Sequence, residues 1–158
     1  MIRTVTGDLL RQDADALVNA VNTAGIMGKG IALQFKRAWP AMFDDYADAC
    51  ARGEVQLGKM HVWSTGSAAP PLLIVNFPTK KHWRSRSQAQ DISSGLEDLV
   101  RVVRDHDLRS IAVPPLGCGY GGLDWAVVEP LIHHGLAAVA DDVDVRVFPP
   151  AGGSTVRP

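Results

Sequence analysis

The sequence predicts an α/β domain with three layers, in which helices cover both faces of a mixed, largely parallel sheet. Short apolar runs with β-type spacing alternate along the chain with longer stretches whose apolar residues recur at helical spacing. One run, LLIV within residues 72–76, is continuously apolar, as expected for a central strand buried on both faces. Strands separated by helices favour parallel pairing, and such sheets bind ligands outside the carboxyl ends of their strands.

The strands are expected where short apolar runs are bounded by turn-forming residues, at residues 2–5, 16–19, 60–64, 72–76, 111–113 and 143–148. Two helices are expected after the first glycine-rich loop, at residues 30–38 and 42–51.

Two more helices are indicated by apolar stripes in the second half of the chain. The first runs from Ile92, with Ser94 and Glu97 as a capping box and a stripe formed by Ile92, Leu96, Leu99, Val100 and Val103. The second follows Asp124, whose carboxylate can cap the helix, and its apolar face comprises Trp125, Val128, Ile132, Leu136 and Val139.

Length and composition indicate one domain, residues 1–150, followed by a Pro-, Gly- and Ser-containing tail or linker at residues 151–158. The net charge of -1 means that any contact with nucleic acid depends on a local basic patch. Cys50 and Cys118 lie far apart without metal-ligand spacing, so we expect a reducing, cytoplasmic setting and no metal. Adjacent His133 and His134 lack the spacing of a zinc pair, and we expect no membrane insertion.

Two glycine-rich loops each follow an expected strand and precede an expected helix. They read TAGIMGKG at residues 23–30 and PPLGCGYGGL at residues 114–123. Glycines let the backbone approach an anion, and a helix N-terminus presents free N–H groups, so the two loops together could hold a diphosphate. Each loop alone could equally be a tight connection. Neither loop ends in the GKS or GKT of a P-loop, and neither has the GxGxxG spacing of a Rossmann dinucleotide site. The absence of these motifs argues against hydrolysis of a nucleotide triphosphate.

Lys80 follows the expected central strand at the edge where ligands bind, and it opens the segment KKHWRSR. A lysine acts as a nucleophile when its pKa is depressed, and we expect partial burial and the neighbouring Lys81 to depress it. The protonated amine could instead stabilise a leaving group. Four positive charges around Trp83 are typical of a single-stranded nucleic-acid contact, although such a run can also be a solvated face.

These motifs resemble the macrodomain family, which binds ADP-ribose. The resemblance rests on TGDLL at residues 6–10, NAVN at 19–22, MGKGIALQF at 27–35 and PPLGCGYGGLDW at 114–125, in the order that the family uses. GKGIA is similar to the branch that contains terminal ADP-ribose glycohydrolase and the DarG antitoxins, and NFPTKKHWR looks closest to the DarG antitoxins. The chain departs from terminal ADP-ribose glycohydrolase at Gly121, where that enzyme has an aspartate.

The resemblance implies roles for particular residues. Lys80 matches the catalytic lysine of the branch, and the alternatives are a solvated surface lysine or a shift of this role to Lys81. Asn19 and Asn22 match the pair that supports loop one and reaches the distal ribose; Asn22 would orient the sugar, and one of the two would serve only the structure of the loop. His82 could substitute as a base or be a surface histidine. The carboxylate of Asp8 would accept a hydrogen bond from the exocyclic amine of adenine, or would cap a turn. The backbone N–H of Leu9 would donate to a ring nitrogen of adenine. Phe148 would stack on adenine or belong to the core. The other ligand contacts implied are Asn19, Thr23, Gly28, Lys29, Gly30, Ile31, Gly117, Cys118, Gly119, Tyr120 and Gly121, and the nucleic-acid contacts are Lys81, Trp83, Arg84 and Arg86.

The resemblance also implies a macrodomain fold and an activity: removal of ADP-ribose from thymine bases of single-stranded DNA, without metal or cofactor, as the antitoxin to a DNA ADP-ribosyltransferase toxin. Two alternatives fit the same loops. One is a module that binds ADP-ribose without turnover, and the other is a hydrolase of protein-linked or O-acetylated ADP-ribose.

Overall fold

Six strands form one mixed sheet in the computed structural model, which describes residues 1–151, so nearly all of the expected tail lies outside the described residues. The strand order is β1-β6-β5-β2-β4-β3, and every neighbouring pair is parallel except β3 with β4. The strands are β1 (Ile2–Thr4), β2 (Ala16–Asn22), β3 (His61–Ser64), β4 (Leu73–Lys80), β5 (Ser110–Val113) and β6 (Asp144–Val147).

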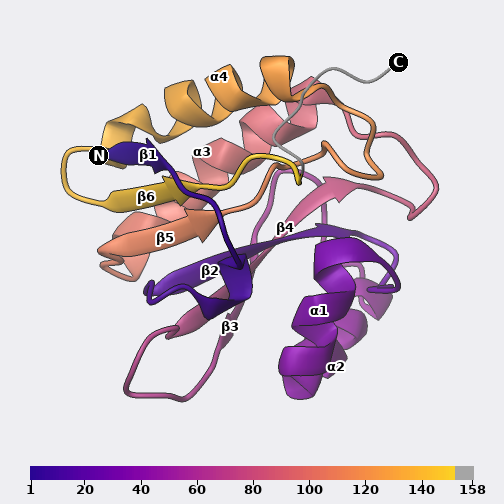
Figure 1. The fold of residues 1–158 in the computed structure, drawn as a ribbon. Helices are drawn as coiled ribbons and strands as arrows, with labels where there is room; N and C mark the ends of the chain where they lie inside the picture. The colour runs from indigo at the N-terminus through magenta and orange to yellow at the C-terminus, as the bar shows by residue number, and fades with distance from the viewer. Residues whose placement is uncertain (152–158) are drawn as a thin grey trace.

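Helices cover both faces of this sheet, as Figure 1 shows, and the predicted three-layer α/β architecture is confirmed. One face carries α3 (Ala89–Asp105) and α4 (Trp125–Leu136), and the other carries α1 (Gly30–Ala38) and α2 (Pro40–Ala51). Two short 3-10 turns, η1 (Leu9–Arg11) and η2 (Ala137–Val139), complete the described elements. None of the described helices is long and apolar enough to cross a membrane.

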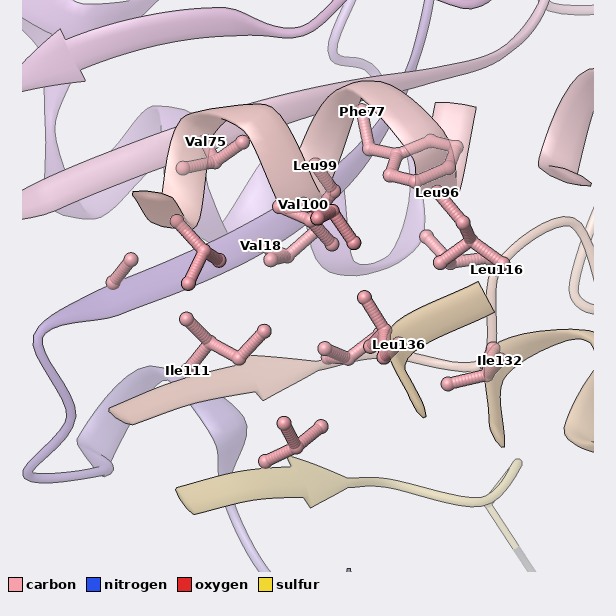
Figure 2. Close-up of a cluster of buried hydrophobic side chains, with 14 of the residues drawn as sticks. Val18, Val75, Phe77, Leu96, Leu99, Val100, Ile111, Leu116, Ile132 and Leu136 are labelled. Atoms are coloured by element: carbon pink, nitrogen blue, oxygen red, sulfur yellow. The ribbon is translucent and has the colours of Figure 1, made fainter. Parts of the chain in front are cut away.

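Side chains of the central strands alternate between two buried clusters, because successive residues of a strand point to opposite faces. In β2, Val18 packs in the cluster beneath α3 and α4, whereas Leu17 packs beneath α1 and α2. Figure 2 shows the first cluster, in which Leu96 and Leu99 of α3 and Ile132 and Leu136 of α4 meet the strands.

Most expected elements are present, with differences at their ends. Strand β4 continues to Lys80 instead of ending at residue 76, and β2 continues to Asn22. The predicted Ser94–Glu97 capping box is wrong, because α3 begins at Ala89 and Ser94 lies inside the helix, where its hydroxyl accepts from the Gln90 amide. The predicted cap of α4 is confirmed, since the Asp124 carboxylate accepts from the N–H of Ala126 at 3.4 Å.

Two glycines let α3 and α4 pack closely on their neighbours. A Cβ atom at Gly95 of α3 would lie 2.4 Å from the ring of Phe77, and one at Gly135 of α4 would lie 2.8 Å from Leu96. Both glycines are in helices, where alanine is the better helix former by about 1 kcal/mol. Close packing against Phe77 and Leu96, and not helix propensity, therefore explains why positions 95 and 135 are glycine.

We expect Gly95→Ala to lower the free energy of unfolding by about 1–3 kcal/mol, because overpacking against Phe77 outweighs the gain in helix propensity. Urea unfolding measures this change. Glu97→Ala, at an exposed position of the same helix, is the control and should change stability by less than about 0.5 kcal/mol. A stabilised Gly95→Ala protein would show that the helix–sheet spacing adjusts freely.

Candidate functional site

Three loops meet at one edge of the sheet because β5, β2 and β4 are neighbours with a common direction. Loop one (residues 23–29) follows β2, the basic segment (residues 81–88) follows β4, and loop two (residues 114–124) follows β5. Together with the strand ends they line a cavity of about 560 Å³. Its lining includes these predicted site residues: Asn22, Gly28, Lys29, Gly30, Ile31, Lys80, Trp83, Gly117, Gly119, Tyr120 and Gly121.

Loop one is held by the side chain of Asn22. Its Oδ1 accepts from the N–H of Ala24 at 3.0 Å and contacts the Tyr46 hydroxyl at 2.9 Å, while its Nδ2 donates to the carbonyl of Ile26 at 2.9 Å. The hydroxyl of Thr23 donates to the carbonyl of Lys81 at 3.0 Å, which ties loop one to the basic segment. Asn22 thus lines the cavity with its amide already engaged, and Thr23 connects the loops without lining the cavity.

Asn19 is fully buried beneath loop one and does not line the cavity, so its position does not support a ligand contact and fits the alternative that it serves only the structure of the loop. Its Nδ2 donates to Oδ1 of Asn76 at 3.0 Å and lies 3.8 Å from the sulfur of Met27. Asn76 is within 3.0 Å of His61 Nδ1, and His61 Nε2 is 2.9 Å from the Asp45 carboxylate. Asn19 therefore belongs to a polar row that supports the start of loop one.

Lys80 ends β4 just beyond an irregularity in the strand pairing. Val21 pairs with Pro78, but Asn22 pairs with Lys80, so Thr79 is an extra residue whose hydroxyl donates to the Val21 carbonyl at 3.2 Å. An extra residue of this kind redirects the side chains that follow it. Lys80 lines the cavity, and its Nζ donates to the Trp83 carbonyl at 3.0 Å.

Burial lowers the pKa of Lys80 below the ordinary lysine value, and the positive charge of Lys29 lowers this pKa further. The predicted effect of burial is confirmed. The predicted effect of Lys81 is wrong, because Lys81 is exposed and Lys29 is the neighbouring charge. No Asp, Glu or His is among the described residues that line the cavity, so no lining carboxylate offsets the two ammonium groups.

Loop two packs tightly against the end of the basic segment. The N–H of Ser87 donates to the Gly121 carbonyl at 2.9 Å, and a Cβ atom at Gly121 would lie 2.3 Å from the Ser87 hydroxyl and 2.5 Å from the Gly117 carbonyl oxygen. Gly117 adopts a φ of +75°, which favours glycine. The sequence of loop two is therefore set by close backbone packing, and position 121 has no room for a side chain.

The basic segment lies at the rim of the cavity. Trp83 lines the cavity. The imidazole of His82 stacks on its ring with the two ring centroids 5.2 Å apart, and Cζ of the Arg84 guanidinium lies 4.4 Å from the centroid of the Trp83 ring. His82 Nδ1 accepts from the N–H of Arg84 at 3.1 Å and does not line the cavity, so its predicted role as a catalytic base is not supported by its position. Arg86 donates to the Gly122 carbonyl at 3.3 Å, and Lys81, Arg84 and Arg86 are exposed.

Four other predicted ligand residues lie outside the cavity lining. Asp8 caps η1 by accepting from the N–H of Leu10 at 3.0 Å, which is the turn-capping alternative, while Leu9 is buried. Phe148 is buried with Leu9 in the cluster beneath α1 and α2, which is its core alternative. Burial raises the pKa of the Cys118 thiol to about 11, so this cysteine is not a thiolate at neutral pH.

The sequence interpretation missed Thr79 and the apolar part of the lining, which comprises Ala20, Val21, Ile26, Ala32, Pro114 and Pro115. Ile26 is 43% exposed in the structure. A large apolar residue inside a glycine-rich loop was the feature of the sequence that could have indicated an apolar contact with a ligand. Residues 1–151 contain no group of three or more His, Cys, Asp or Glu that could hold a metal ion.

A three-layer fold with two glycine-rich loops and a lysine around a cavity at the sheet edge defines the class of macrodomains. The model of the Macro domain family matches residues 18–132, and the chain belongs to this family.

Curated relatives narrow the comparison. The chain is 55% identical over 154 residues to the DNA ADP-ribosyl glycohydrolase of Mycobacterium tuberculosis and 50% identical over 150 residues to that of Thermus aquaticus. These matches cover 98% and 95% of this chain but 44% and 41% of the relatives, so the chain spans less than half of their length. It is also 33% identical over 161 residues, covering 92% of this chain and 41% of the relative, to a DNA ADP-ribosyl transferase-DNA ADP-ribosyl glycohydrolase fusion protein of Thermosipho africanus.

Solved structures show the same similarity. The macrodomain of Mycobacterium tuberculosis DarG superposes with a TM-score of 0.93 at 54% identity, covering 96% of this chain and 99% of that one. The structure titled Thermosipho africanus DarTG in complex with ADP-ribose gives a TM-score of 0.87 at 34% identity, covering 95% of this chain and 42% of that one. The predicted macrodomain fold and the predicted likeness to DarG are confirmed.

We expect Gly121→Ala to lower the free energy of unfolding by about 1–3 kcal/mol, because the added methyl group would displace Ser87 or the backbone of Gly117. Gly119→Ala in the same loop is the matched control, since a Cβ atom there meets nothing within 4 Å. Thermal or urea unfolding of both variants measures the difference. Equal stability of the two variants would contradict the tight packing described here.

Proposed function

We propose that this chain is a DNA ADP-ribosyl glycohydrolase that releases ADP-ribose from thymine bases of single-stranded DNA. The observation that carries the proposal is the Lys80 amine, which lines the cavity with a depressed pKa and with no carboxylate among the described lining residues. The two glycine-rich loops would serve a binding module equally well, so Lys80 is the feature that discriminates between the two functions. A neutral amine is a nucleophile, and a lowered pKa increases the fraction of the amine that is neutral at a given pH.

The two glycine-rich loops supply the binding part of the site. Backbone N–H groups of the two loops and the N-terminus of α1 at Gly30 favour an anion, and a diphosphate between the loops fits these donors. The terminal ribose of ADP-ribose would then extend toward Lys80 at the end of β4. Asn22 contributes by fixing the shape of loop one through its hydrogen bonds with Ala24, Ile26 and Tyr46.

In the proposed reaction, the neutral amine of Lys80 bonds to C1 of the terminal ribose, and the bond from C1 to the thymine nitrogen breaks with its electron pair going to thymine. The proton that the amine loses neutralises the thymine. The ribose ring of the adduct then opens as its ring oxygen takes the remaining N–H proton, which leaves a Schiff base between C1 and the lysine nitrogen. Water adds to C1 of this Schiff base, the amine departs with the proton of the new hydroxyl group, and closure of the ribose ring gives free ADP-ribose and regenerates Lys80. These steps use water and the side chain, without a metal or a cofactor.

The relatives support the choice of substrate and of biological partner. Proteins 50–55% identical to this chain are named DNA ADP-ribosyl glycohydrolases. In the Thermosipho africanus relative a transferase is fused to the glycohydrolase, which supports the proposal that this chain reverses the modification made by a DNA ADP-ribosyltransferase toxin and acts as its antitoxin. The exposed charges of Lys81, Arg84 and Arg86 near the cavity suit the phosphates of a DNA strand.

We expect Lys80→Ala to abolish release of ADP-ribose from a single-stranded oligonucleotide carrying ADP-ribosyl thymine, while the affinity for ADP-ribose stays within about threefold. Chromatography of the products measures turnover, and calorimetry measures the affinity. The expected loss is at least about 100-fold, because the nucleophile is removed. Lys59→Ala, at an exposed position outside the cavity lining, is the control and should retain full activity.

Other outcomes of this experiment assign other functions. Binding of ADP-ribose without turnover by the unaltered protein would identify a receptor. Release from protein-linked or O-acetylated ADP-ribose but not from DNA would identify the other class of hydrolase.

We expect kcat to rise with pH and to level off below the ordinary lysine pKa of about 10.4, because the reactive form of Lys80 is the neutral amine and its pKa is lowered. Lys29→Met removes the neighbouring positive charge, so the midpoint of the profile should move to higher pH. Rates measured between about pH 6 and pH 10 test both statements. A kcat that falls as the pH rises would instead assign Lys80 an electrostatic role as the protonated ammonium.

A further inference from the structure

Tyr120 is the most exposed aromatic side chain at the cavity. It lines the cavity from loop two, and 68% of the residue is accessible to solvent. The edge of its ring lies against the first residue of α1, since a Cβ atom at Gly30 would be 3.5 Å from Cε2 of Tyr120. Burial does not explain an aromatic ring in this position, because most of its surface faces solvent.

Lys29 connects Tyr120 with the basic segment. Its Nζ lies 5.2 Å from the centroid of the Tyr120 ring and 5.9 Å from that of Trp83, so the ammonium is between two rings that come from different loops. Lys29 also precedes the N-terminus of α1, where the helix dipole disfavours a cation. The aromatic faces offset this unfavourable position.

The two rings differ in how much of their surface is engaged. Trp83 contacts the imidazole of His82 and the guanidinium of Arg84 from its own segment, in addition to Lys29. Among the described residues, Lys29 is the one cation that lies over the Tyr120 ring, and this ring takes part in no aromatic pair. A planar ligand therefore has easier access to Tyr120 than to Trp83.

We propose that Tyr120 stacks on an unmodified base next to the ADP-ribosylated thymine and that Lys29 leaves the Tyr120 ring for a phosphate when the strand binds. The proposal rests on the function proposed above and names how the flanking strand is recognised. A DNA backbone supplies the anion that attracts Lys29, and the vacated ring accepts a base. Because every base has an aromatic face, this contact adds affinity without choosing a sequence.

Two substrates separate the flanking strand from the modified nucleotide: an oligonucleotide carrying ADP-ribosyl thymine, and ADP-ribosyl thymidine, which has no flanking bases. For Tyr120→Ala we expect KM for the oligonucleotide to rise about 5- to 150-fold, the range for loss of one stacked base. Because Tyr120 lines the cavity, part of the effect is shared with ADP-ribosyl thymidine and with free ADP-ribose, and the proposal requires the rise for the oligonucleotide to exceed that shared part by at least about fivefold. Tyr120→Phe keeps the ring and should restore the oligonucleotide KM, whereas Val127→Ala, exposed on α4 outside the cavity lining, is the neutral control.

Three results would overturn the proposal. An equal loss for both substrates would place Tyr120 against the modified nucleotide itself, no loss for either would leave the ring without a role, and a loss confined to Trp83→Ala would assign the stacking to Trp83. If the unaltered protein releases no ADP-ribose, the proposed function fails separately. Calorimetric binding of both substrates to Lys80→Ala then still measures the contribution of Tyr120, through a Tyr120→Ala change in that background.

Discussion

A buried polar row across three strands determines how the site loops are placed. His61 of β3, Asn76 of β4 and Asn19 of β2 are paired in register, and hydrogen bonds connect them from the Asp45 carboxylate at one end to the neighbourhood of Met27 at the other. A shift of either strand pairing by one residue would turn the amides to the opposite face, where the cluster beneath α3 and α4 is apolar. Buried amides without partners cost about 1–3 kcal/mol each, so the row strongly favours one register.

That register fixes the relation between loop one and Lys80. Because β2 and β4 run in parallel with defined partners, the ends of the two strands lie side by side. The extra residue Thr79 comes just before the last residue of β4, so it changes the direction of the Lys80 side chain and leaves the preceding pairs in register. The backbone N–H of Thr23 then bonds to the carbonyls of Lys80 and Lys81 at 3.1 and 3.2 Å, which joins loop one to the strand that carries the lysine. The binding loop and the reactive group thus share one hydrogen-bonded frame.

The sequence predicted the parts of this arrangement that depend on local pattern. Glycine-rich loops after strands, the apolar run before Lys80 and the cap at Asp124 are all visible in the order of residues, and the structure places them as expected. It did not predict contacts between distant segments: the row through His61, the effect of Lys29 on Lys80, and the burial of Asn19. Such contacts depend on strand register and on a single extra residue in β4, and neither has a signature in composition or periodicity.

Gly121 shows how packing constrains the chemistry. Terminal ADP-ribose glycohydrolase resembles this chain in motif, but its aspartate has no counterpart here, where a Cβ atom at position 121 would lie 2.3 Å from the Ser87 hydroxyl. That hydroxyl is itself buried without a hydrogen-bond partner among the described residues, so the close approach of the two segments carries a cost. A single change to aspartate would have to displace Ser87 and a backbone carbonyl. No carboxylic acid is among the described residues of the cavity lining, so in the proposed reaction the leaving thymine takes its proton from the attacking amine or from water. A thymine anion is a weaker base than an alkoxide, and it therefore leaves more readily without the help of an acid.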